Sequence, residues 1–200
     1  MVEPRPSVEV YKMTLAVDVA SRSNCMKSHV GAIILTDDRI RAVGYNGTIE
    51  GYADCFAGGC ERCRDVSVTQ GVNLDRCVCV HAEENALVSA ARYGIEVEGA
   101  ECFVTHEPCL GCTKLLIQAH VGRVVYLKSY EYPDETGQNK SREAMRSHAR
   151  KRFDEGRSAT RFEQFDQSVP EVGEWIARLE IMKHIALEYA RANNVLERGP

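Results

Sequence analysis

Apolar residues recur along the first quarter of the chain with spacings that predict a helix and a pair of strands. Between residues 7 and 21 they fall at three- and four-residue steps and form one broad helical stripe. Two short apolar runs follow at residues 30–35 and 40–45, separated by the turn pair Asp37 and Asp38. The first run is β-branched and apolar on both sides, which predicts a strand buried on both faces. The second run is expected to return antiparallel to the first.

Two helix–strand pairs are predicted in the middle of the chain. A helix from Ala82 ends before Gly94 and precedes a strand at 102–105. A second helix opens at Pro108 and precedes a strand at 123–127, and its inner face is expected to carry Leu115, Leu116 and Ala119. This alternation implies right-handed crossovers and a parallel component in the sheet. We therefore predict an α/β protein, a three-layer α/β/α core around a central mixed five-stranded sheet, ending near residue 130.

The remaining residues, 131–200, predict a helical C-terminal extension. Residues 131–168 are charged and turn-rich, with a short helix expected at 141–153. Apolar residues then recur at helical steps and predict a strongly amphipathic helix at about 169–192, whose apolar stripe consists of Val172, Trp175, Ile176, Leu179, Met182, Ile185, Ala186 and Tyr189. Such a helix most often packs on its own core or on a neighbouring subunit, and a lid over an active site is the alternative.

Composition narrows the class of protein. Hydrophobic residues make up 44% and charged residues 27% of the 200 residues, as in ordinary soluble proteins. The net charge of −4 argues against non-specific binding of a polynucleotide, which needs a basic surface. No apolar run has membrane-spanning length, and the first residues do not resemble a signal peptide. Nine cysteines in such a chain favour metal ligation over disulfides, and we expect a cytoplasmic location.

The strongest chemical signal is a pair of short motifs, His-Ala-Glu at 81–83 and Pro-Cys-Leu-Gly-Cys at 108–112. Together they reproduce the H-x-E…P-C-x-x-C signature of zinc deaminases that act on nucleobases. His81, Cys109 and Cys112 would hold a zinc ion and leave its fourth position to water. The two cysteines share one face of the first turn of a helix, where the helix dipole favours thiolates.

This motif also predicts the chemistry. Bound zinc lowers the pKa of its water to about 7 and so supplies hydroxide at neutral pH. Glu83 would accept the proton of that water, pass it to a ring nitrogen and finally protonate the departing ammonia. A closed structural zinc site with an incidental glutamate is the alternative, but the combined motif at this spacing favours catalysis.

From residue 10 to about 130 the chain resembles the deoxycytidylate (dCMP) deaminases and their competence-associated bacterial relatives. The resemblance rests on Arg22-Ser23, Val30-Gly31-Ala32, Gly44-Tyr45-Asn46-Gly47-Thr48, His81 to Ala86, Val104 to Cys112 and Val124-Val125-Tyr126. It implies the cytidine-deaminase fold, with residues 1–130 as the zinc-dependent deaminase domain. It also implies hydrolysis of dCMP to dUMP and ammonia, which feeds thymidylate synthesis. Family members are commonly homohexamers, and many are activated by dCTP and inhibited by dTTP.

The resemblance also suggests which residues bind the nucleotide. Asn46 would contact the sugar, since its amide offers both a donor and an acceptor beside glycines that permit close approach. Ala82 is expected in the same substrate site. Arg22 and Lys27 are candidates for the 5′-phosphate, with solvated surface charges as the alternative.

Several relatives carry a second, structural zinc held by cysteines. The residues nearest to those family positions are Cys25, Cys55, Cys60 and Cys77. A closed zinc site there would also clamp an otherwise irregular loop. Cys63 and Cys79 are additional candidates, which leaves the four ligands open, whereas Cys102 is expected to be a small apolar core residue.

Other functions are compatible with the zinc motif. The substrate could be a C5-modified dCMP, or the chain could deaminate adenosine or guanine. Tyr45, Asn46 and the acidic composition weigh against a tRNA-editing enzyme. A non-catalytic nucleotide-sensing or DNA-uptake accessory protein of the same fold would not need Glu83.

Overall fold

The computed structural model describes residues 5–68, 76–129 and 159–196. In chain order its elements are α1 (Val8–Ala20), β1 (Gly31–Thr36), β2 (Arg39–Tyr45), β3 (Gly47–Thr48), the 3₁₀ turn η1 (Cys55–Ala57), α2 (Glu61–Arg64), β4 (Cys79–Val80), α3 (Ala82–Arg92), β5 (Glu101–His106), α4 (Leu110–Gln118), β6 (Arg123–Lys128), β7 (Arg161–Gln164) and α6 (Glu171–Ala192). The predicted helix at 141–153 lies outside the described residues.

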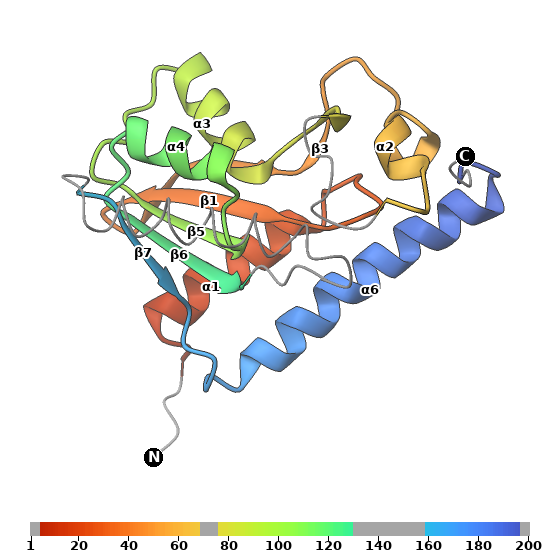
Figure 1. The fold of residues 1–200 in the computed structure, drawn as a ribbon. Helices are drawn as coiled ribbons and strands as arrows, with labels where there is room; N and C mark the ends of the chain where they lie inside the picture. Colours follow the sequence, from red (N-terminus) through yellow and green to blue (C-terminus); the bar gives the residue numbers. More distant parts are fainter. Residues whose placement is uncertain (1–4, 69–75, 130–158, 197–200) are drawn as a thin grey trace, which may run out of the picture.

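Five strands form the central sheet in the order β2-β1-β5-β6-β7 (Figure 1). β1 is antiparallel to both of its neighbours, whereas β5, β6 and β7 run parallel to one another. The predicted fold class, with its mixed five-stranded sheet, is confirmed. The fifth strand was not identified from the sequence, because β7 is a four-residue edge strand with no buried residue and no apolar alternation.

Successive residues of the inner strands point to opposite faces of the sheet. Ile33 and Leu35 of β1 join α1 and α6 in one hydrophobic cluster. Ala32 and Ile34 join α3 and α4 in the other. Figure 1 shows these two helix layers on either side of the sheet. β1 is therefore buried on both faces, as its β-branched run predicts.

Two glycines allow helices to lie directly against strands. A Cβ at Gly31 would stand 2.2 Å from the carbonyl oxygen of Ala16 in α1. A Cβ at Gly44 would stand 2.1 Å from the carbonyl oxygen of Ala82, the first residue of α3. No side chain fits at either distance, so glycine is required for this packing. The second contact places the first turn of α3 directly against β2.

Two details of the predicted helix faces differ from the structure. Leu115 of α4 was expected on the inner face but is 43% exposed, because the helix turns Cys112 and Leu116 inward. The amphipathic helix is present as α6, and it buries Val172, Trp175, Leu179, Ala186 and Ala190. Ile185 and Tyr189, expected on the same stripe, are exposed. No helix in the described parts of the chain is long and apolar enough to cross a membrane.

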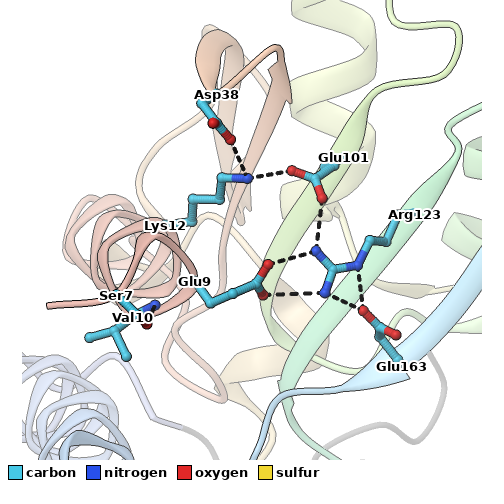
Figure 2. A network of polar contacts seen from close by, with 8 residues as sticks. All are labelled: Ser7, Glu9, Val10, Lys12, Asp38, Glu101, Arg123 and Glu163. Atoms are coloured by element: carbon cyan, nitrogen blue, oxygen red, sulfur yellow. Dashed lines mark hydrogen bonds and ion pairs between the residues drawn. The ribbon is translucent and has the colours of Figure 1, made fainter.

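A network of charges joins one end of the sheet (Figure 2). Arg123 of β6 contacts Glu9 of α1, Glu101 of β5 and Glu163 of β7. The Lys12 ammonium bridges Glu101 and Asp38, at 2.7 Å from the latter, and is almost completely buried. Glu101 therefore contacts both cations. The network as a whole links α1, the β1–β2 turn and the strands β5, β6 and β7.

Candidate active site

The three predicted catalytic zinc ligands meet at the N-termini of α3 and α4. His81 is the N-cap residue of α3, Cys109 is the N-cap residue of α4, and Cys112 lies in the first turn of α4. The Nδ1 atom of His81 stands 3.4 Å from the Sγ atom of each cysteine. β5 of the central sheet leads into α4, whereas α3 follows β4 of the separate two-stranded sheet, so tertiary packing brings the two helix starts together.

The donor set fits zinc. Bonds of about 2.0–2.3 Å in a tetrahedron place neighbouring ligand atoms about 3.5–3.8 Å apart, close to the distances found here. Within the described ranges no fourth histidine, cysteine or carboxylate joins His81, Cys109 and Cys112 in this group. Three protein ligands with one open direction are typical of a catalytic zinc site rather than a structural one.

Glu83 lies beside these ligands and is only 4% exposed. Burial raises the pKa of its carboxyl group to about 7, against an opposing effect of His81. A carboxyl group with this pKa can both accept and release a proton near neutral pH. Its position two residues after His81, in the first turn of α3, keeps it within the same pocket.

A pocket opens beside the ligands. Asn46, Ala82 and Lys27, three of the four residues predicted to bind substrate, line it together with Glu83. The fourth, Arg22, is exposed and does not belong to the lining.

Asn46 is held in a fixed orientation. Its Oδ1 atom accepts hydrogen bonds from the Ser23 hydroxyl at 2.7 Å and from the backbone N–H of Val30 at 2.8 Å. Its Nδ2 atom donates to the carbonyl of Ser28 at 2.9 Å. A primary amide has two N–H donors, so among the described residues the second N–H of Asn46 remains available to a ligand. No role was predicted for Ser23 from the sequence, although it stands in the family motif Arg22-Ser23.

The other polar groups of the lining are partly engaged. The Lys27 ammonium donates to the carbonyls of Asp65 and Val68, both at 2.9 Å. An ammonium has three donors, so a ligand oxygen can still be bound. His106 also lines the pocket, and its Nδ1 atom is 3.1 Å from the Thr105 hydroxyl. Burial lowers the pKa of His106 to about 3, so the ring is neutral.

The remaining predicted metal ligands lie on the neighbouring side of the pocket. Six cysteine Sγ atoms gather there in two groups of four, each within 4.8 Å of one another. One group contains Cys25 and Cys55, the other contains Cys60 and Cys77, and both contain Cys63 and Cys79. The four cysteines predicted as a single site are thus divided between the groups. Cys102 is fully buried in β5.

A family model described as the cytidine and deoxycytidylate deaminase zinc-binding region matches residues 6–128. The chain belongs to this family. Its core and its three clustered ligands therefore correspond to the family's zinc-binding region, in agreement with the resemblance seen in the sequence.

Several relatives carry the name of one enzyme. The deoxycytidylate deaminase of Saccharomyces cerevisiae is 44% identical over 132 residues, which are 66% of this chain and 41% of the yeast protein. The deoxycytidylate deaminase of Mycobacterium phage D29 is 40% identical, over 62% of this chain and 97% of the phage protein. ComE operon protein 2 of Bacillus subtilis is 38% identical, over 64% and 62%. The chain thus matches about two-fifths of the yeast relative's length.

A solved structure supports the same fold. The dCMP deaminase of cyanophage S-TIM5, in complex with dCMP and dUMP, superposes with a TM-score of 0.56 at 27% identity. The match covers 80% of this chain and 98% of the phage chain.

Proposed function

We propose that this chain is a zinc-dependent hydrolase that converts dCMP to dUMP and ammonia and so feeds thymidylate synthesis. The observation that carries the proposal is the buried Glu83 carboxyl beside His81, Cys109 and Cys112, in a pocket that Asn46 also lines. The deoxycytidylate deaminases of yeast and phage D29, and the phage structure with dCMP and dUMP, favour this substrate over other bases.

The residues of the pocket would have separate roles in the reaction. His81, Cys109 and Cys112 would hold the zinc ion, which supplies Lewis acidity and a water of lowered pKa. Glu83 would take a proton from the attacking water and give it to the ring nitrogen next to C4. It would then take the second proton from the hydroxyl group added at C4 and give it to the amino group, which leaves as ammonia. A pKa of about 7 suits a group that must carry out both transfers.

Other residues that line the pocket would bind the nucleotide. Asn46 would direct its remaining N–H to the sugar, and Ala82 would pack beside the base. Lys27 is better placed than the exposed Arg22 to bind the 5′-phosphate, because it reaches the pocket. We retain Arg22 as a second phosphate contact in the proposal.

The test is an ammonia-release assay on a substrate panel: dCMP, CMP, cytidine, dCTP, 5-methyl-dCMP, adenosine and guanine. Turnover is expected to be highest with dCMP and abolished in Glu83→Ala. Preference for 5-methyl-dCMP would assign the chain to modified nucleotides, and preference for a purine would overturn the proposal. Nucleotide binding without ammonia release would indicate an accessory protein.

Regulation and assembly complete the proposal. By the family resemblance we propose activation by dCTP, inhibition by dTTP and a homohexamer in solution. The same assay with each triphosphate, and light scattering of the purified protein, test these points. Unchanged rates or a monomeric mass would remove them without affecting the deamination itself.

We also propose that the cysteine group beside the pocket holds structural zinc. The predicted ligands Cys25, Cys55, Cys60 and Cys77 all lie in it, and their thiols come from three separate segments of the chain. A metal that joins such segments would contribute directly to folding.

A further inference from the structure

The six clustered cysteines are arranged as two overlapping sets rather than as one set with two spare thiols. The first set is completed by Cys25 and Cys55, and the second by Cys60 and Cys77. Cys63 and Cys79 belong to both sets, so their Sγ atoms lie within 4.8 Å of those of both other pairs. Five of the six side chains are buried, and Cys77 is half-buried.

The spacing of Cys60 and Cys77 suits two thiolates on one zinc ion and not a disulfide. A tetrahedral zinc ion with bonds of about 2.3 Å separates its sulfur ligands by about 3.8 Å. The Sγ atoms of Cys60 and Cys77 are 3.7 Å apart, whereas a disulfide bond is about 2.05 Å long. All six cysteines are free.

We infer that the six cysteines hold a binuclear zinc cluster in which the thiolates of Cys63 and Cys79 bridge the two metal ions. Cys25 and Cys55 would be the terminal ligands of one ion, and Cys60 and Cys77 those of the other. Each zinc ion requires four ligands, and six thiolates satisfy two ions only when two of them are shared. The inference deepens the proposed structural zinc and rests on it.

Sharing also limits the charge that must be buried. Six thiolates carry a charge of −6, so the net charge would be −2 with two zinc ions and −4 with a single zinc ion. The guanidinium group of Arg62, only 4% exposed, lies 3.7 Å from the bridging sulfur of Cys63. A buried cation at this position offsets negative charge where both metal ions share a ligand.

The cluster would tie the active site together. It joins the segment after α1, the η1–α2 region and β4. Cys79 pairs with Thr48 in β3 and stands two residues before the zinc ligand His81. Cys25 follows Ser23, whose hydroxyl accepts from the Cys25 N–H and donates to Asn46. Both the catalytic ligand and the sugar-binding amide are therefore attached to cluster residues.

The zinc content of the unmodified chain tests the inference. Native mass spectrometry with elemental analysis is expected to give three zinc ions per chain. The double variant Cys109→Ser/Cys112→Ser should retain two. Two ions in the unmodified chain would overturn the binuclear cluster but keep a single structural zinc, and one ion would remove both. Neither result depends on turnover, so deamination is judged separately by the substrate panel.

Bridging itself is tested by exchange with ¹¹³Cd. Two cadmium resonances coupled to each other through shared sulfur are expected, and two uncoupled resonances would overturn bridging. As a variant test, Cys63→Ser should lose both cluster ions, whereas Cys102→Ala, a buried cysteine outside the cluster, should keep all three. Cys63→Ser with two cluster ions retained would contradict the bridge; if this variant does not fold, the cadmium spectrum of the unmodified chain decides.

Discussion

Glu83 and Asn46 are buried polar side chains that line the same pocket. The proposed role of each can be tested by a single substitution. For Glu83, the variant Glu83→Gln keeps the shape of the side chain but removes its ability to carry a proton. We expect the turnover number to fall by about 10²–10⁴-fold, the usual contribution of a general acid–base, with catalytic zinc retained. Steady-state kinetics and metal analysis measure the two effects.

Glu84→Gln is the matched control, because Glu84 is adjacent in α3 and does not line the pocket. It should leave turnover within about twofold. Equal losses in both variants would mean that Glu83 acts through local structure and not as a proton carrier.

Ser23 hydrogen-bonds both Asn46 and the backbone N–H of Cys25, and it is predicted to position Asn46. In Ser23→Ala the Oδ1 atom of Asn46 loses one of its two hydrogen bonds. A loss of about 1 kcal/mol, or about fivefold in kcat/KM for dCMP, is expected, mostly as a higher KM. Ser21→Ala, which removes an exposed hydroxyl at the end of α1, serves as the control. An unchanged KM would show that Asn46 does not depend on Ser23.

Among the elements, α3 matters most to the site because its first turn carries His81 and Glu83. Gly44→Ala would press a methyl group against the backbone of Ala82 and displace this turn. We expect a destabilisation of about 2–3 kcal/mol together with weaker binding of the catalytic zinc. Chemical denaturation and competition with a metal chelator measure these effects.

Gly173→Ala is the control for this substitution. Nothing lies within 4 Å of a Cβ at Gly173, which is in the first turns of α6. Alanine there should stabilise the protein by up to about 1 kcal/mol, because glycine is a poor helix former. A Gly44→Ala protein as stable as the parent would contradict the close packing of α3 on β2.

The positions of the helices α4 and α6 along the chain were predicted more accurately than which of their residues are buried. The apolar period predicts α4 and α6, yet it placed Leu115, Ile185 and Tyr189 on buried faces. Whether a helical residue is buried depends on which element packs against its side of the helix. Neighbouring positions on a helix differ by about 100°, so a small rotation exchanges a buried residue for an exposed one.

At the scale of the whole molecule, the charge network around Glu101 predicts a pH-dependent stability. Burial alone would raise the pKa of Glu101, but hydrogen bonds from Lys12 and Arg123 outweigh it and hold the pKa below its usual 4.5. Because the folded pKa is lower than the unfolded one, ionised Glu101 stabilises the fold above about pH 4.5. This stabilisation is lost as the pH falls through the folded value.

Glu101→Gln should therefore lower the free energy of unfolding by about 2–3 kcal/mol at pH 7, and by less as the pH approaches 3. Denaturant titrations across this range measure the difference. Glu98→Gln, whose side chain is 73% exposed, is expected to have little effect at any pH. A difference that stays constant from pH 7 to pH 3 would contradict the lowered pKa.

The sequence alone predicted most elements of the core and the three candidate zinc ligands, because both are encoded locally. Periodicity fixes a helix or strand within a dozen residues, and His81, Cys109 and Cys112 each stand at the start of a helix. Which distant groups meet was decided by the tertiary structure. β7 is recognisable only through its pairing with β6, and the two overlapping sets of cysteines exist only because segments around residues 25, 60 and 78 converge. Contacts between segments far apart in the chain leave no period in the sequence, so only folding reveals them.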